Sequence, residues 1–380
     1  MDHTLGDRRH RGRIDEFIGK ALYNLDLPGL AIGVSVGAGS PAPSAGTRHE
    51  AAAGYLDMPE GIPLRTDSIF HMASVSKLFV STGILMLMER GLLDLDAPVA
   101  GYLPWMRMDD PRFARVTARQ LLSHTAGMPD VEDYAWDAPE FDRGALKRYL
   151  CSPEVVGARL LWEPGDGRFR YSNMGYELLG ALASELSGLD FESFMEDGLM
   201  RPADMASSTF LTFRRGLGRR PHGSGPPGER EAALGLGLAA LREAGVCSPH
   251  FKDADRLIAR ERRFPYNRAH APSSTLTSSL GDMLIWGDAH LRRGLLRPET
   301  YAEAWAARAL VPNNGEGIGL GWFIREQGGH RLYGHEGTDD GFRASFWICP
   351  DLDLQIAVMS NLSEAPVKKI NRQVFDILTS

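Results

Sequence analysis

A serine and a lysine three residues apart, Ser74 and Lys77, have the residue types and the spacing of a nucleophile and its base. The sequence changes there from a strand-like to a helical pattern, which places the pair at the start of an amphipathic helix. One helical turn puts both side chains on the same face, so the amine can reach the hydroxyl. The helix N-terminus adds positive potential and free N–H groups for an oxyanion. The pair predicts nucleophilic catalysis, although this spacing also occurs by chance.

Two later segments hold further candidate residues. Tyr171-Ser172-Asn173 follows a turn signal and precedes a helix, where a serine or an asparagine alone would be an ordinary capping residue. His335-Glu336-Gly337-Thr338 precedes a predicted strand, and a histidine beside glycine is by itself most often part of a loop. His124 is expected only to order its own loop. What favours a catalytic interpretation is the presence of all three segments in this order.

With these segments the sequence resembles the penicillin-recognising serine hydrolases. That family includes class C β-lactamases, D-Ala-D-Ala carboxypeptidases, D-aminopeptidases and β-lactamase-like esterases. The S-x-x-K motif is Ser74 to Lys77, the Y-x-N motif is Tyr171 to Asn173, and His335 to Gly337 occupies the place of K-T-G. Supporting stretches flank the serine and precede the tyrosine, so that the resemblance covers about residues 15 to 365.

The resemblance implies an acyl-transfer reaction. Ser74 would attack an ester or amide carbonyl, and water or another nucleophile would then resolve the acyl-enzyme. Lys77 and Tyr171 are both candidates for the general base, and the sequence does not decide between them.

The resemblance also implies a set of substrate-binding residues. The oxyanion would lie between the backbone N–H groups of Ser74 and Thr338, while Asn173 and His335 would orient the substrate. Gly337, the glycine of the H-x-G segment, belongs to the same predicted binding site.

His335 departs from the family pattern, because the K-T-G motif has a lysine at this place. An imidazole carries little permanent charge at neutral pH, so a fixed cation for a substrate carboxylate is lost or becomes dependent on pH. Typical β-lactamase activity is therefore not favoured. Glu336 is bulkier and more acidic than the usual middle residue, and in an extended segment it would point away from His335 and only face solvent.

A carboxylesterase is the favoured activity. The alternatives are a D-amino-acid amidase or peptidase, a transacylase in small-molecule biosynthesis, a weak β-lactamase, and a non-hydrolytic acyl sensor that uses the fold for binding. The expected partner is a small ester, amide or peptide substrate. No cofactor or metal is expected, because the three cysteines form no CxxC pair and the common metal- and nucleotide-binding motifs are absent.

Composition limits the other function classes. Lys+Arg number 42 and Asp+Glu 49, which gives a formal net charge of -7 and no basic excess for nucleic acid or an anionic membrane. The first 20 residues lack the apolar run of a secretory signal, and no window is long and apolar enough to span a bilayer. We expect a cytoplasmic protein without a nucleic-acid or membrane partner, and the oligomeric state stays open.

The elements that must position these residues differ between the ends and the middle of the chain. Strands are expected near both ends, at residues 29–36, 48–55, 319–325, 341–349 and 354–361. Helices are expected at residues 74–91, 118–122, 143–149, 174–187, 191–199, 280–291 and 367–378. Residues 213–230, which are rich in Gly, Pro and Arg, are interpreted as an exposed loop.

Strands at both ends with helices between them predict one sheet built from the two termini. Together with the resemblance, this predicts an α/β (α+β) fold of the β-lactamase type, with a mostly antiparallel sheet flanked by helices. The sheet domain is placed at residues 1–73 and 280–380, and an inserted all-helical domain at residues 74–279. The active site is expected at their interface.

Overall fold

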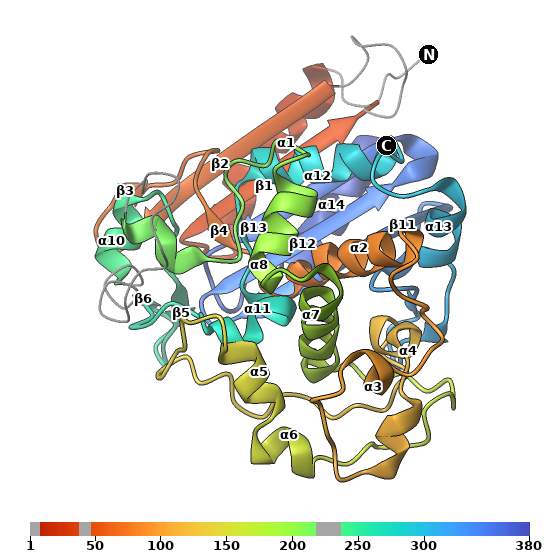
Figure 1. Cartoon of the computed structure of the whole chain (residues 1–380). Helices are drawn as coiled ribbons and strands as arrows, with labels where there is room; N and C mark the ends of the chain where they lie inside the picture. The colour runs from red at the N-terminus through yellow and green to blue at the C-terminus, as the bar shows by residue number, and fades with distance from the viewer. Residues whose placement is uncertain (1–7, 38–46, 218–236) are drawn as a thin grey trace.

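The centre of the molecule is a nine-stranded antiparallel sheet in the computed structural model, which describes residues 8–37, 47–217 and 237–380. The strand order is β3-β2-β1-β13-β12-β11-β10-β9-β8. Strand β1 near the N-terminus pairs with β13 near the C-terminus, so the first and last strands lie side by side (Figure 1). The bounds are β1 Gly29–Val36, β2 Thr47–Asp57, β3 Ile62–Pro63, β8 Ala309–Leu310, β9 Gly317–Ile318, β10 Phe323–Gln327, β11 His330–Asp339, β12 Phe342–Cys349 and β13 Leu354–Ser360.

Helices cover both faces of this sheet, which explains why β1 and β13 are buried along their whole length. On one face, α1 (Arg8–Asn24) and α14 (Val367–Thr379) share a core with alternate residues of β1, such as Ile32 and Val34. On the other face lies α12 (Leu280–Leu291), which approaches β1 so closely that a Cβ atom on Gly33 would lie 3.2 Å from Leu280. Burial on both faces accounts for the apolar composition of the central strands.

The middle of the chain is mostly helical. The helix α2 is buried along most of its length and packs against α7 beneath the sheet (Figure 1). The bounds are α2 Ser76–Glu89, α3 Val99–Tyr102, α4 Ala118–Leu122, α5 Ala145–Leu150, α6 Pro153–Gly157, α7 Asn173–Ser187, α8 Phe191–Met195, α10 Leu238–Glu243, α11 Ala271–Ser274 and α13 Pro298–Ala304. A 3₁₀ turn, η1 (Ala73–Val75), precedes α2 and contains the candidate nucleophile.

The predicted antiparallel sheet flanked by helices is confirmed, with corrections to three segments. The middle segment is not all-helical, because it also contains the β5 (His250–Lys252) and β6 (Ile258–Arg260) hairpin, and β7 (Thr277–Ser278) pairs with β4 (Phe70–His71). The domain boundaries at residues 73/74 and 279/280 stay a prediction.

The exposed loop predicted at residues 213–230 begins inside a 3₁₀ helix, Thr212–Leu217. Phe213 is fully buried in the main core, which overrides the polar character of the residues that follow it. The remainder of the predicted loop, residues 218–230, lies outside the described residues.

The third correction concerns the strand that carries the candidate histidine. The strand predicted at residues 319–325 begins only at Phe323, and His335 lies inside β11 rather than before a strand. The sequence of β11 contains glycines and charged residues in place of an alternating apolar pattern, so periodicity did not reveal it.

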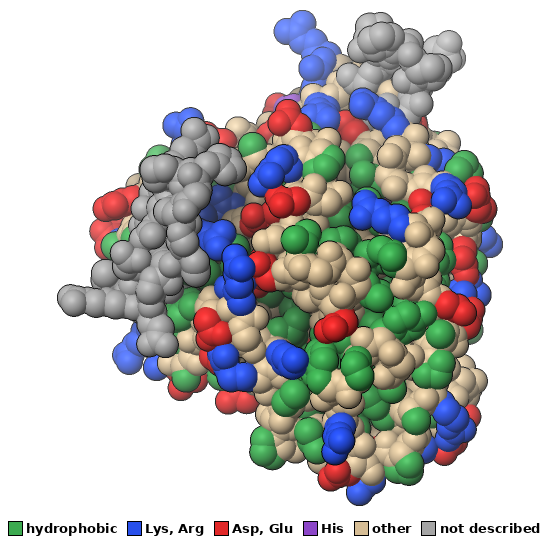
Figure 2. All heavy atoms as spheres, in the orientation of Figure 1, with side chains coloured by type: hydrophobic (Ala, Val, Ile, Leu, Met, Phe, Trp, Pro, Cys, Tyr) green, Lys and Arg blue, Asp and Glu red, His purple; other side chains and the backbone are tan. Residues whose placement is uncertain are grey.

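In the described part of the chain no helix has the length and apolar character needed to cross a bilayer. In the view of Figure 2, hydrophobic side chains gather below the middle of the face, and side chains of both charges are interspersed around them.

Candidate active site

A cavity of about 410 Å³ brings together residues from distant parts of the chain. Five of the seven predicted site residues line it, namely Ser74, Tyr171, Asn173, His335 and Thr338. The sheet contributes one wall through β11, and η1 and the N-terminus of α7 contribute the others. The cavity therefore lies between the sheet and the helices, where the sequence analysis expects the active site.

The Lys77 amine lies behind the wall of this cavity and contacts the Ser74 hydroxyl. Its Nζ is 3.1 Å from Ser74 Oγ, 2.6 Å from Asn173 Oδ1 and 2.7 Å from the carbonyl oxygen of Ser273. Lys77 has no exposed surface, and this burial lowers the pKa of its amine to about 7 against the opposing effect of nearby carboxylates. The amine therefore loses its proton near neutral pH and can then accept the proton of Ser74.

The Tyr171 hydroxyl is buried and has no hydrogen-bond partner among the described residues. Its ring centroid lies 5.0 Å from Lys77 Nζ and 4.4 Å from the ring of His124. Burial raises the pKa of the phenol well above its usual value, although the neighbouring Ser74 hydroxyl acts in the opposite direction. The phenol thus keeps its proton at the pH at which Lys77 loses its own.

His124 holds the segment that carries the tyrosine. Its Nδ1 accepts the Ser172 N–H at 3.2 Å, and its carbonyl accepts the Arg170 N–H at 2.9 Å. Burial lowers the pKa of His124 well below its usual value, so the ring stays neutral and keeps Nδ1 as an acceptor. The sequence analysis expected His124 only to order its own loop, whereas these contacts join that loop to the segment of Tyr171.

Asn173 is the first residue of α7, which Ser172 caps by accepting the Gly175 N–H. Both the backbone N–H and the side-chain amide of Asn173 donate to Asp130 Oδ1, at 2.7 and 2.9 Å. This pair of bonds turns the amide oxygen of Asn173 toward Lys77. Asp130 was not identified from the sequence.

His335 projects from β11 into the same cavity. Its Nδ1 donates to the carbonyl of Glu336 at 2.5 Å, which leaves Nε2 buried and without a partner among the described residues. Burial, assisted by the nearby Lys77, lowers the pKa of His335 to about 3. The imidazole is therefore neutral across the physiological range, and the place of the K-T-G lysine carries no charge.

Gly337 allows β11 to pack against the segment that precedes the serine. A Cβ atom at this position would lie 2.2 Å from the Met72 carbonyl oxygen, which no side chain tolerates. Strand β10 pairs with β11 only as far as Gly334, so residues 335–339 pair with β12 alone and keep one free edge. Thr338 lies on this stretch and lines the cavity.

A family model described as Beta-lactamase matches residues 14–379. The chain belongs to the beta-lactamase family. This confirms the resemblance to penicillin-recognising serine hydrolases that the three motifs indicated.

Curated relatives within the beta-lactamase family include two penicillin-binding proteins. Penicillin-binding protein 4 of Amycolatopsis lactamdurans is 26% identical over 347 residues, which are 88% of this chain and 81% of that protein. Penicillin-binding protein 4* of Bacillus subtilis is 27% identical over 317 residues, 82% of this chain and 64% of that protein. The chain thus spans less than two thirds of the second relative.

Solved structures show the same fold. A penicillin-binding protein homologue from Pyrococcus abyssi aligns with a TM-score of 0.78 and 21% identity over 97% of this chain and 77% of that chain. The D-amino acid amidase of Ochrobactrum anthropi aligns with a TM-score of 0.73 and 19% identity over 98% of this chain and 97% of that chain. At these identities the likeness establishes the beta-lactamase-like fold and nothing further.

This member of the beta-lactamase family has a buried acid behind its lysine. Ser273, whose carbonyl accepts from Lys77, donates its hydroxyl to Glu177 Oε1 at 2.6 Å, and His270 contacts the same oxygen at 3.2 Å. The helix α11 reaches this place because Gly180 of α7 has no side chain, and a Cβ atom there would lie 2.1 Å from Pro272. These contacts join residues far apart in the chain and leave no motif in the sequence.

The prediction that Glu336 faces solvent is wrong. The Trp347 indole N–H donates to Glu336 Oε1 at 2.8 Å, while Oε2 is buried without a partner among the described residues. Burial raises the pKa of this carboxyl. Glu336 lines the same cavity as His335, and a tryptophan from β12 covers its carboxylate.

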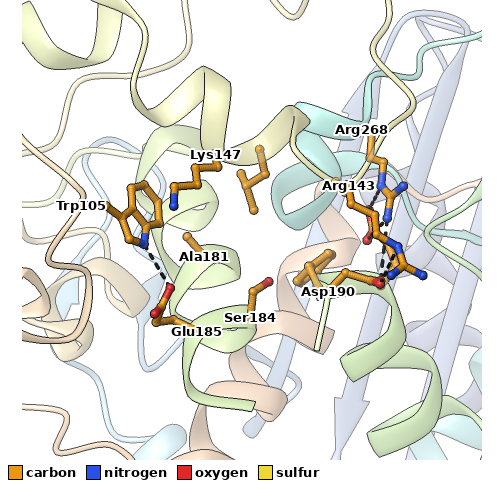
Figure 3. Close-up of a pocket in the computed structure, with 12 residues that line it drawn as sticks. Trp105, Arg143, Lys147, Ala181, Ser184, Glu185, Asp190 and Arg268 are labelled. Atoms are coloured by element: carbon orange, nitrogen blue, oxygen red, sulfur yellow. Dashed lines mark hydrogen bonds and ion pairs between the residues drawn. The ribbon is translucent and has the colours of Figure 1, made fainter. Parts of the chain in front are cut away.

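A smaller cavity of about 160 Å³ lies among α5, α7 and α8 (Figure 3). The Trp105 indole N–H donates to Glu185 at 3.0 Å on one side, and Arg143 pairs with Asp190 at 3.2 Å on the other. None of the seven predicted site residues lines it. The predicted residues thus gather at the cavity that contains Ser74 and not at this one.

Proposed function

We propose that this protein is a serine hydrolase that forms an acyl-enzyme at Ser74 from an ester or an amide, with carboxylesterase activity favoured. The observation that carries the proposal is the contact between Lys77 Nζ and Ser74 Oγ at 3.1 Å, made by an amine without exposed surface. An amine with a pKa of about 7 is available as a base at neutral pH.

In the proposed acylation step, Ser74 Oγ bonds to the carbonyl carbon and its proton moves to Lys77. The backbone N–H groups of Ser74 and Thr338 would hold the oxyanion, because the free edge of β11 lies against η1. Tyr171 would then give its proton to the leaving group as the ester or amide bond breaks, and would regain a proton from Lys77.

Deacylation repeats these transfers with water as the nucleophile. A water molecule attacks the acyl carbonyl and gives its proton to Lys77; as the bond to Ser74 Oγ breaks and the acid product leaves, Tyr171 would give its proton to Oγ and regain one from Lys77. The raised pKa of Tyr171 supports its role as the proton donor rather than as the initial base.

Uncharged substrates are favoured over carboxylates because the site offers no free cation at the place of the K-T-G lysine. His335 has a pKa of about 3 and is neutral. Lys368 also lines the cavity, but its amine pairs with Glu316 at 2.7 Å. This arrangement supports simple esters over penicillins.

A D-amino-acid amidase is the second candidate. The wall of the cavity contains the carboxylates Asp130 and Asp339, which suit a substrate with an amino group. The D-amino acid amidase of Ochrobactrum anthropi has the same fold. The two activities share the Ser74 chemistry and differ in the leaving group and in recognition.

The test of the proposed function is turnover of a short-chain p-nitrophenyl ester by Ser74→Ala. Loss of the nucleophile should lower kcat/KM by at least about 1,000-fold while the protein stays folded. The matched control is Ser187→Ala, at the end of α7 and away from the cavity, which should keep its activity within about twofold. Activity within tenfold of the wild type in folded Ser74→Ala would contradict the proposal.

A further inference from the structure

Asp339, the last residue of β11, presents a carboxylate to the Ser74 cavity. It follows Thr338 and lines both this cavity and an adjoining outer cavity of about 400 Å³. Two donors hold the carboxylate from behind: His71 Nε2 donates to Oδ2 at 2.8 Å, and the Ser274 hydroxyl donates to the same oxygen. Because both use Oδ2, no described residue donates to Oδ1.

The support behind Asp339 is rigid. His71 is fully buried and packs between Phe264 and Phe342, whose ring centroids each lie 5.6 Å from its own. The Asp339 side chain is 11% exposed, so only a small part of it reaches the cavity. A carboxylate held in this way is prepared to receive one more donor.

The charges around this carboxylate favour a positive ligand. Asp130 shares the inner cavity, and three further carboxylates, Glu132, Asp133 and Asp340, line the outer one. Arg343, which also lines the outer cavity, donates Nη1 to the backbone carbonyls of Asp339 and Phe342. Lys77, behind the wall of the inner cavity, contacts three acceptors. Lys368, which lines this cavity, pairs with Glu316.

Two other features of the cavity suit an organic ammonium group. Tyr134 lines both cavities and stacks on Trp136, with the two ring centroids 4.7 Å apart. The stacked rings provide an aromatic wall for a cation. His335 is 3% exposed and lines the cavity. Its Nε2 is buried and has no hydrogen-bond partner among the described residues. Because Nδ1 carries the proton of the neutral imidazole, Nε2 is left as an acceptor for an N–H group of a ligand and does not repel its positive charge.

We propose that Asp339 binds a protonated amine of the substrate, so that the preferred substrates are esters or amides with an ammonium group close to the scissile carbonyl. The inference rests on the proposed Ser74 chemistry and names the substrate class for it. Amino-acid esters and amides have this structure, with the amine one carbon from the carbonyl.

The experiment compares two alanine p-nitrobenzyl esters, one with a free amine and one N-acetylated, each as the D and the L form. At pH 6.5 the wild type should have a kcat/KM for the free amine at least tenfold higher than that for the N-acetyl ester of the same hand. In Asp339→Asn this ratio should fall at least tenfold. Asp340→Asn removes the same charge one residue later and should change the ratio less than threefold.

A measurement on the wild type alone decides the question if Asp339→Asn does not fold. Raising the pH from 6.5 to 9 deprotonates the α-amino group, whose ordinary pKa is about 7.7 to 8.0. The preference for the free amine should then fall at least tenfold, with the N-acetyl ester correcting for ionisation of the enzyme.

Three results would overturn the inference: no wild-type preference at pH 6.5, an unchanged ratio in folded Asp339→Asn, or an equal effect of Asp340→Asn, which would assign the preference to the combined charge of the acidic residues.

The inference and the proposed function fail differently. If both esters are hydrolysed through Ser74 at the same rate, only the inference is wrong. If neither is hydrolysed and Ser74 is never acylated, the proposed function is wrong as well.

Discussion

The amine of Lys77 lies 3.1 Å from the hydroxyl of Ser74 and has no exposed surface. Helical spacing alone brings these side chains onto one face, but the burial that makes the amine a base comes from the packing of α2 against α7 and β11. The contact between the two residues therefore depends on the whole fold. Substitutions of Lys77 itself and of residues that pack around it can test it.

Replacement of Lys77 by arginine should nearly abolish turnover. A guanidinium cannot give up its proton, so the base is lost although the positive charge remains. We expect kcat/KM for a p-nitrophenyl ester to fall at least about 1,000-fold. Lys147→Arg, at a surface position of α5, is the matched control. An active Lys77→Arg enzyme would assign the base to another group.

The pH dependence of kcat/KM should follow the ionisation of Lys77. Because the base must be deprotonated and its pKa is about 7, activity should rise as the pH increases through 7 and be lost below it. His335, with a pKa of about 3, should add no limb in this range. The rising limb should therefore stay in place in His335→Asn. A profile that is flat between pH 5 and 9 would argue against Lys77 as the base.

Lys77 should also make the free energy of unfolding depend on pH. The folded pKa of about 7 lies below the unfolded value of about 10.4, so between these values the unfolded chain binds more protons. The contribution of Lys77 to stability therefore rises with pH across this window. From pH 7.5 to 9.5 the wild type should gain roughly 2 to 3 kcal/mol relative to Lys77→Met in urea unfolding. If the unfolding free energies of the two proteins changed in parallel with pH, the pKa of the Lys77 amine would not be lowered in the folded protein.

His335→Lys should shift the preference toward anionic substrates. A lysine restores the cation of the K-T-G motif, and its interaction with a carboxylate is worth on the order of 1 kcal/mol, or about fivefold in kcat/KM. The comparison is the ratio of kcat/KM for a penicillin to that for a neutral ester at pH 7.5. Should the wild type already prefer the penicillin, or the ratio stay the same in the variant, His335 would not determine charge selectivity.

Gly337→Ala should damage the site through the backbone. The added methyl would lie 2.2 Å from the Met72 carbonyl, so β11 must move away from the segment that precedes Ser74. We expect a loss of about 1 to 3 kcal/mol in unfolding free energy and a larger proportional loss of activity. Gly157→Ala is the control, since no atom lies within 4 Å of its added Cβ. Equal stability and activity of the two variants would contradict the close packing.

The sequence predicted the elements that follow local rules. Helix periodicity and capping signals extend over only a few residues of sequence. They identified the serine and lysine three apart, the start of α7 beside its tyrosine, and the span of α12. The sheet built from both termini also followed from the order of apolar segments.

The parts that depend on distant contacts were not predicted. Asp130 contacts the site from a loop and Ser273 from α11, and nothing in their local sequence distinguishes them from other polar residues. Glu336 was expected in solvent because the outer side of an extended segment was taken to be solvated, whereas Trp347 of the neighbouring strand buries it. Such contacts arise from strand pairing and helix packing, which single-sequence periodicity does not encode.

The most direct measurement is mass spectrometry of the protein quenched at successive times during hydrolysis of p-nitrophenyl butyrate. A serine hydrolase that uses Ser74 should carry one butyryl group on the peptide containing that residue, and the group should disappear at least as fast as the enzyme turns over. Ser74→Ala should carry none. Turnover without acylation of Ser74, acylation at another residue, or an adduct that never decays would contradict the proposed hydrolase.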